Sequence, residues 1–229
     1  MTGHPAILAL DTSARDAYVG LLLGHAIEIA EVDRSGGRHA RKLVPTVDAL
    51  LERHALKPVD LTGVVVNLGP GSFTGLRVGI TVAQTLGWLT GVPLVGVGLF
   101  ERLAHQTASQ SDRPRVFVAN AEREELFIAT AAVGKSTASP TQIVPAASLG
   151  DLACDAAVFG SLPARVDCGL PPDRIQTPAV DPVTALLQLG RTKLDAGQTT
   201  SPAQLLPVYG RRSAAEELRD AGRRPNYAR

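Results

Sequence analysis

Two short segments carry the residue types that proteins use to bind phosphate. Residues 11–13 read Asp-Thr-Ser after an apolar run, and residues 69–75 read Gly-Pro-Gly-Ser-Phe-Thr-Gly just before a predicted helix. A glycine turn at a helix N-terminus can bind an anion. The glycine turn lacks the lysine of a Walker loop and does not match the dinucleotide fingerprint. The candidate phosphate ligands in this turn are Gly71 and Ser72.

The alternative interpretation of both segments is structural. Three glycines and a proline within residues 69–75 fix a tight turn from strand to helix, since glycine adopts backbone angles that other residues resist. Asp11 and Thr12 can satisfy the end of their strand by local hydrogen bonds. The sequence leaves both interpretations open.

The predicted helix over residues 75–90 has one nearly bare face. Its small residues recur every four positions, and residues at that spacing share a face. Glycine costs about 1 kcal/mol relative to alanine inside a helix, so this glycine stripe indicates close approach by another backbone. That backbone belongs either to a helix of another chain or to the chain's own sheet. The first interpretation predicts a partner interface of Gly75, Leu76, Gly79, Ala83 and Gly87.

Other kinds of catalytic chemistry find little support in the sequence. The five histidines are never three or four residues apart, as two metal ligands on one helix would be. Cys154 and Cys168 are too few for a zinc cluster, and no Gly-x-Ser-x-Gly elbow is present. The sequence therefore predicts no metal site and no catalytic nucleophile.

Composition indicates a globular protein of one large or two small domains. The chain has 229 residues, of which 45% are hydrophobic and 20% charged. A net charge of +1 gives no strong overall attraction to nucleic acid or membranes, although residues 211–229 are locally basic. No apolar run is long enough for a membrane span, and the first residues do not resemble a signal peptide. We expect a cytoplasmic protein.

Hydrophobic periodicity predicts an α/β fold with a mixed sheet in the first half of the chain. The expected strands there cover residues 6–10, 17–23, 27–32, 64–68 and 94–97. The expected helices cover residues 43–51, with Pro45 near the start, and 75–90. In the second half of the chain, the expected strands cover residues 115–119, 126–133 and 156–160, and the expected helix covers 183–196. Long irregular loops are expected between residues 140 and 182. A capping box at Ser213 predicts a short C-terminal helix over 214–221.

Residues 7–13 (Ile-Leu-Ala-Leu-Asp-Thr-Ser) and 68–77 (Leu-Gly-Pro-Gly-Ser-Phe-Thr-Gly-Leu-Arg) resemble the TsaB (YeaZ) family. Further matches lie at residues 37–40, 91–93 and 207–209, and the resemblance is dense over residues 6–103. Members are bacterial proteins required for threonylcarbamoyladenosine at position 37 of tRNAs that read codons beginning with A. The resemblance implies an actin-like ATPase fold of two RNase-H-like lobes with mixed sheets. It also implies that Asp11, Thr12 and Ser13 stand at the first phosphate loop of such ATPases, where they are candidate phosphate ligands. The lobes would cover residues 1–103 and 104–212, and a C-terminal helix within 213–229 would pack back on the first.

The resemblance also implies partners. The glycine-striped helix would pair with the catalytic paralogue, TsaD, or with a second copy of this chain when TsaD is absent. An ATPase, TsaE, would complete the assembly, and this chain would contact tRNA as part of that complex. No cofactor is expected to bind tightly, and ATP or ADP could lie at the interface between partners.

Two departures from the family pattern affect the expected chemistry. The catalytic paralogue binds a metal through a His-x-Glu-Gly-His motif, and residues 99–103 align with it as Leu-Phe-Glu-Arg-Leu, so leucine replaces each histidine. In the second half, Asn120, Glu122 and Glu124 stand where family members often have aspartate, arginine and glycine. The resemblance therefore indicates a non-catalytic partner subunit. The alternative is a stand-alone actin-like ATPase, kinase or peptidase.

Overall fold

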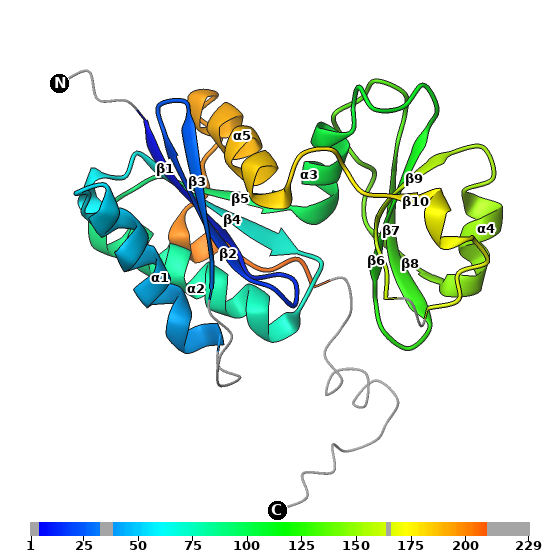
Figure 1. Ribbon diagram of the computed structural model, residues 1–229, viewed down its shortest axis with the longest axis horizontal. Coiled ribbons are helices and arrows are strands. Elements are labelled where there is room, and N and C mark those ends of the chain that lie inside the picture. The colour runs from blue at the N-terminus through cyan, green and yellow to red at the C-terminus, as the bar shows by residue number, and fades with distance from the viewer. Residues whose placement is uncertain (1–4, 33–38, 164–165, 210–229) are drawn as a thin grey trace, which may run out of the picture.

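The computed structural model describes residues 5–32, 39–163 and 166–209. These residues form two five-stranded mixed sheets, which lie side by side with helix α3 between them (Figure 1). The expected C-terminal helix falls outside the described residues. No helix among the described residues is long and apolar enough to cross a membrane.

The first sheet has the strand order β3-β2-β1-β4-β5. β1 pairs with β2, and β2 with β3, in antiparallel fashion, whereas β1, β4 and β5 are parallel. β4, which lies between β1 and β5, is buried almost throughout, as its nearly continuous apolar run predicts. The strands are β1 (Ala6–Asp11), β2 (Tyr18–Leu23), β3 (Ala26–Glu31), β4 (Gly63–Gly69) and β5 (Leu94–Gly98).

The second sheet repeats the pairing pattern of the first. Its order is β10-β9-β6-β7-β8, in which β6, β7 and β8 pair antiparallel and β6, β9 and β10 are parallel. The strands are β6 (Arg115–Asn120), β7 (Glu125–Ala131), β8 (Gln142–Pro145), β9 (Ala157–Ser161) and β10 (Ile175–Gln176). Each sheet thus has the RNase-H-like topology, a duplication that no sequence repeat revealed. β8, β10 and the short helix α4 (Leu149–Leu152) lie where irregular loops were expected.

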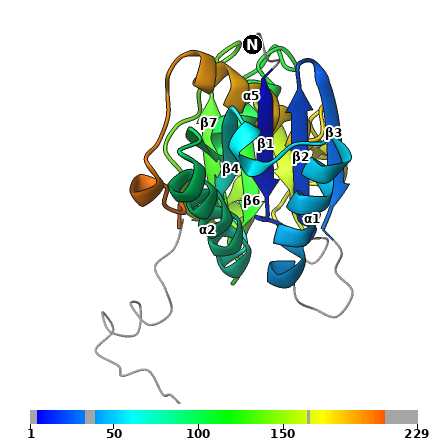
Figure 2. The same cartoon turned by 90° about the vertical axis from the view of Figure 1, so that its left-hand side faces the viewer.

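Helices cover both faces of the first sheet, because alternate residues of its strands point to opposite sides. α1 (His39–Arg53) and α2 (Phe73–Thr90) lie side by side on one face, and α5 (Pro182–Asp195) lies on the other (Figures 1 and 2). On β1, Leu8 and Leu10 join the core under α1 and α2, whereas Ile7 and Ala9 join the core under α5. α1 continues through Pro45 without ending.

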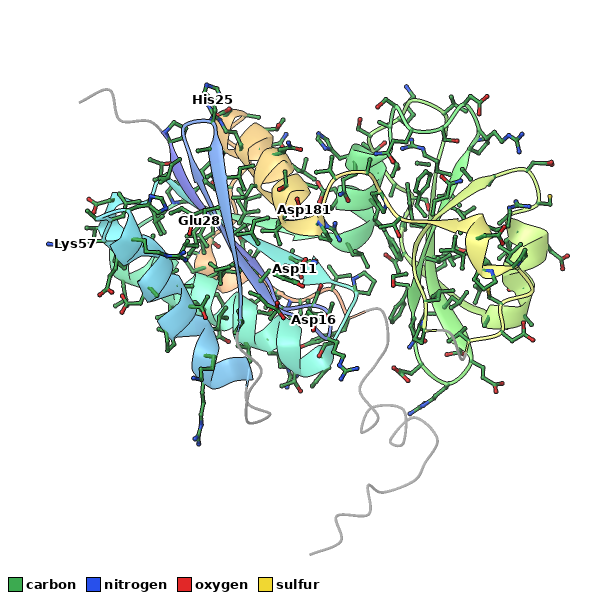
Figure 3. All side chains as sticks on the ribbon, viewed as in Figure 1. Asp11, Asp16, His25, Glu28, Lys57 and Asp181 are labelled. Atoms are coloured by element: carbon green, nitrogen blue, oxygen red, sulfur yellow. The ribbon has the colours of Figure 1, made fainter. Side chains whose placement is uncertain are left out.

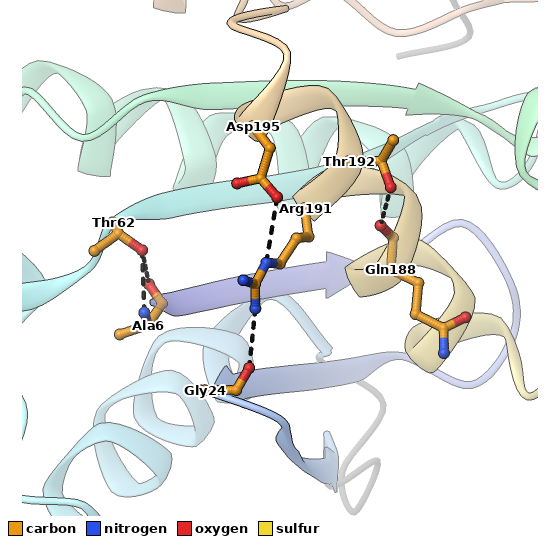
Figure 4. A network of polar contacts seen from close by, with 7 residues as sticks. All are labelled: Ala6, Gly24, Thr62, Gln188, Arg191, Thr192 and Asp195. Atoms are coloured by element: carbon orange, nitrogen blue, oxygen red, sulfur yellow. Dashed lines mark hydrogen bonds and ion pairs between the residues drawn. The ribbon is translucent and has the colours of Figure 1, made fainter. Parts of the chain in front are cut away.

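The placement of α5 corrects the expected boundary of the second lobe. α5 packs against β1, β2, β4 and β5, and Arg191 donates a hydrogen bond of 3.0 Å to the Gly24 carbonyl in the β2–β3 turn (Figure 4). Farther on, Thr200 pairs with Leu94 of β5, and the Val208 amide donates to the Leu68 carbonyl. The chain from α5 onward therefore belongs to the first lobe, since the apolar side of α5 covers a sheet face that would otherwise meet water. The range 104–212 is wrong at its C-terminal end.

Helix α3 (Leu99–Gln106) connects the lobes and packs on the second sheet. Its Phe100 ring lies 6.5 Å from the ring of Phe117 in β6. Arg115 is fully buried at the start of β6 and donates to the carbonyl of Ala104 and the hydroxyl of Thr107. These bonds fix the end of α3 against the start of β6, the central strand of the second sheet.

Candidate functional site

Asp11, at the end of β1, is buried and bonded within the chain. Asn67 of β4 donates from Nδ2 to both carboxylate oxygens at 3.1 Å. The Ser13 amide and hydroxyl donate to the same carboxylate at 3.1 and 2.6 Å. The carboxylate therefore joins the ends of two neighbouring strands and closes the turn that follows β1.

The other candidate phosphate ligands lie next to Asp11 and are also engaged. The Thr12 hydroxyl donates to the Gly75 carbonyl at 2.7 Å, and the Ser72 amide donates to the Ser13 carbonyl at 2.6 Å. The Ser72 hydroxyl caps α2 by accepting from the Gly75 amide at 3.2 Å. A Cβ added at Gly71 would lie 2.5 Å from the Ser13 carbonyl oxygen. The five residues thus meet at one place, and the hydroxyls of Thr12, Ser13 and Ser72 make hydrogen bonds within the chain.

The glycine stripe of α2 faces the chain's own first lobe. A Cβ at Gly75 would overlap the carbonyl oxygen of Thr12, and one at Gly79 would overlap the Thr12 hydroxyl. A Cβ at Gly87 would lie 2.8 Å from the Leu94 side chain. The close approach that the stripe indicated is therefore made by Thr12, just after β1, and by Leu94 of β5. This corrects the expected partner interface of Gly75, Leu76, Gly79, Ala83 and Gly87, of which all but Gly75 are buried.

Outside the glycine stripe, α2 carries large exposed apolar side chains. Trp88 and Leu89 are 64% and 78% exposed, near the end of the helix. Val44, on the neighbouring helix α1, is 56% exposed. We call these three residues the outer helix face. Trp88 and Leu89 lie about 100° and 200° around the helix from Gly87, so neither is on the buried stripe.

The leucines that replace the metal-binding histidines are packed as core residues. Leu103 is 4% exposed in a cluster with Phe117 and Phe127, and Leu99 packs against the same cluster. Glu101, between them, pairs with Lys193 of α5 at 2.6 Å. Among the described residues, no group of three or more histidine, cysteine, aspartate or glutamate side chains could hold a metal ion.

Arg102 of α3 brings a buried cation to the same end of the first sheet. Burial lowers the pKa of its guanidinium, and the negative charges of Asp11 and Asp181 oppose that shift. Asp181 caps α5 by accepting from the Val183 and Thr184 amides. Figure 3 labels both carboxylates on the side of the first lobe that faces the second. Sequence reasoning did not pair Arg102 with either, because α3 and α5 are distant along the chain.

The turn between β6 and β7 contains the second departure from the family pattern. Glu122, Arg123 and Glu124 all have positive φ, of 61°, 52° and 60°. Left-handed backbone costs roughly 1–2 kcal/mol for each such residue, and Glu124 stands at the expected glycine. Asn120 exchanges two hydrogen bonds of 3.1 Å with Glu122. The polar side chains here build the turn itself.

Replacing Asp11 with alanine should lower the free energy of unfolding by about 2 kcal/mol. The buried Asn67 amide would lose both carboxylate acceptors and keep the Ser13 hydroxyl, and Ser13 would lose the acceptor of its own amide and hydroxyl. Asp11→Asn, which keeps an acceptor oxygen, should cost less. Urea denaturation measures both. An unchanged midpoint for Asp11→Ala would show that the carboxylate does not hold the strand ends.

Two lobes of RNase-H-like topology, with a connecting helix between their sheets, define the class of actin-like ATPase folds. A family model described as TsaD, tRNA N6-adenosine threonylcarbamoyltransferase, matches residues 33–153. An uncharacterized protein of Mycobacterium tuberculosis is 31% identical over 214 residues, which span 93% of this chain and 94% of that protein. The chain belongs to the TsaB (YeaZ) family, as its N-terminal motifs predicted.

Relatives with functional names match mainly one half of the chain. The tRNA threonylcarbamoyladenosine biosynthesis protein TsaB of Bacillus subtilis is 37% identical over 98 residues, or 43% of each chain. The protein of that name in Escherichia coli is 29% identical over 113 residues, or 49% of this chain and 48% of its own. The solved structure of YeaZ from Pseudomonas aeruginosa has a TM-score of 0.66 and 23% identity, covering 90% of this chain and 99% of that one. It shows the same fold.

Proposed function

We propose that this chain is a non-catalytic subunit required for threonylcarbamoyladenosine formation at position 37 of tRNAs that read codons beginning with A. It binds the catalytic, TsaD-like paralogue and holds it in a competent arrangement. Two findings support this role: the TsaB name of its bacterial relatives and the match of residues 33–153 to the TsaD family model.

The observation that carries the non-catalytic role is the packing of Leu99 and Leu103. A leucine side chain has no lone pair for a metal, and Leu103 is buried against Phe117 of the second sheet. A histidine there would have to bury its polar ring nitrogens in an apolar cluster, which is costly without partners. The hydroxyls of Thr12 and Ser13 are likewise engaged within the chain, which gives the stand-alone ATPase little support.

The surface proposed for the catalytic partner is the outer helix face, formed by Val44, Trp88 and Leu89. Large exposed apolar side chains on two adjacent helices suit a helix-to-helix interface. The same surface would join two copies of this chain when the paralogue is absent. A TsaE-like ATPase and an ATP or ADP molecule would be held at the interface of the assembled partners.

The lone tryptophan gives a direct test of this surface. Trp88 is 64% exposed, so adding a tryptophan-free TsaD-like protein should shift or quench its fluorescence and saturate at a fixed stoichiometry. An unchanged emission spectrum in a complex confirmed by gel filtration would place the contact elsewhere.

The isolated chain should not hydrolyse ATP at an ordinary enzyme rate of about 1 per second or more.

A further inference from the structure

Three exposed side chains from distant parts of the sequence form one cluster at the start of α2. The rings of Phe73 and Tyr209 have centroids 4.9 Å apart. The Arg77 guanidinium carbon lies 3.9 Å from the Phe73 centroid and 5.5 Å from that of Tyr209. Arg77 Nε also donates to the Tyr209 hydroxyl at 2.6 Å. We call this group the aromatic–arginine cluster.

The cluster is exposed but firmly supported. Phe73 and Tyr209 are 45% and 41% exposed, so their rings remain accessible to a ligand. The Val208 amide beside Tyr209 bonds the Leu68 carbonyl at 2.8 Å. Phe73 and Arg77 lie on the first turns of a long helix. A ligand would therefore meet rings that are already positioned, which lowers the entropic cost of binding.

The charges around the cluster favour an anionic ligand. The first turn of α2 contains no acidic residue, and the positive end of the helix dipole lies there. The Nε bond to Tyr209 leaves the two terminal nitrogens of Arg77 for a second partner. Arg15, in the β1–β2 loop, is also exposed, two residues beyond the Ser13 carbonyl that accepts from Ser72.

We propose that the aromatic–arginine cluster binds unpaired RNA. One base stacks on the exposed aromatic surface of Phe73 and Tyr209, and Arg77 pairs with a neighbouring phosphate. Aromatic rings beside a cation bind unpaired bases through stacking, whereas a paired base keeps its faces covered by its neighbours. The inference rests on the proposed function, because the tRNA anticodon loop supplies such bases.

The cluster lies apart from Trp88, the largest side chain of the surface proposed for the protein partner. Phe73 and Trp88 are fifteen positions apart on α2, which corresponds to about 22 Å along the helix. Trp88 and the cluster therefore lie at opposite ends of α2. This separation allows RNA binding and partner binding to be tested with different variants of one helix.

The test measures the fluorescence anisotropy of a labelled anticodon stem-loop RNA with the full-length chain. Phe73→Leu and Tyr209→Leu should each weaken binding about tenfold, whereas the matched control Trp88→Leu should leave it unchanged. Arg77→Gln should reduce the salt dependence of binding by about one unit. A fully paired RNA duplex should bind more weakly than the stem-loop and should not respond to the ring variants.

A fourth variant separates RNA binding from folding. Thr74→Glu places a carboxylate in the exposed first turn of α2. Its negative charge interacts favourably with the helix dipole but repels the phosphates of RNA. It should keep or raise the thermal unfolding midpoint and weaken RNA binding. Normal RNA binding by Thr74→Glu and the ring variants would overturn the inference.

Capture of the TsaD-like paralogue distinguishes the two proposals. If the ring variants lose the paralogue but keep RNA binding, the cluster is a protein interface and the inference is wrong. If the unmodified chain fails to capture the paralogue, the proposed function is wrong. The RNA measurement would still test independently whether the cluster binds RNA.

Discussion

Replacing Gly75 with alanine should destabilise the first lobe by roughly 2–3 kcal/mol. The new Cβ would overlap the carbonyl oxygen of Thr12, and this backbone atom cannot rotate away as a side chain would. Thr12 is also held by its own hydroxyl, which donates to the Gly75 carbonyl at 2.7 Å. Alanine favours a helix interior by only about 1 kcal/mol over glycine. The steric overlap outweighs this gain, so the substitution should lower the free energy of unfolding.

Urea denaturation of Gly75→Ala measures this effect. Thr81→Ala on the exposed face of the same helix is the matched control and should change the free energy of unfolding by less than about 0.5 kcal/mol. Gly79→Leu should also destabilise the chain, because Thr12 occupies the space beside Gly79. A Gly75 or Gly79 variant of normal stability that cannot bind the paralogue would show that the stripe meets another chain.

Trp88→Asp should weaken binding of the TsaD-like paralogue about 30-fold or more, the loss typical of an interface hot spot. The substitution removes a large exposed ring and places a charge where the interface would exclude water. Since Trp88 is 64% exposed in the chain itself, the folded subunit should lose little stability. Biolayer interferometry gives the affinity, and thermal unfolding gives the stability.

The matched control for Trp88→Asp is Val133→Asp. Val133 is 50% exposed just after β7 in the second lobe, so its substitution makes a comparable change of polarity far from α2. It should leave the affinity unchanged. Equal losses in the two variants would point to a general effect of surface charge and would contradict an interface at the outer helix face.

Local sequence patterns were sufficient for most elements of the first lobe. The apolar run 64–68 and the glycine turn after it predicted β4 and α2, and the structure confirms both. The four-residue period also identified the buried side of α2. It could not say which backbone approaches that side, because periodicity describes one helix and contains no information on its neighbour. The answer depended on Thr12, sixty-three positions before Gly75.

The contacts that sequence reasoning missed are those between distant segments. α5 was expected as a helix, but nothing in its own pattern indicates which of the two sheets it covers. Tyr209 and Arg77 are 132 positions apart, and each lay in a motif that had been noted separately. Arg102 was seen only as part of a lost metal motif, and its approach to Asp181 follows from how α3 and α5 cross. Short strands such as β10 carry too few residues for any period to appear.

The most direct test of the proposed function is a reconstituted tRNA modification assay. It combines the TsaD-like paralogue, a TsaE-like ATPase, unmodified tRNA and the threonylcarbamoyl-adenylate donor, with and without this chain. We predict that threonylcarbamoyladenosine forms only when the chain is present, and that Trp88→Asp fails to restore it while Val133→Asp succeeds. Full modification without the chain, or with Trp88→Asp in its place, would contradict the account.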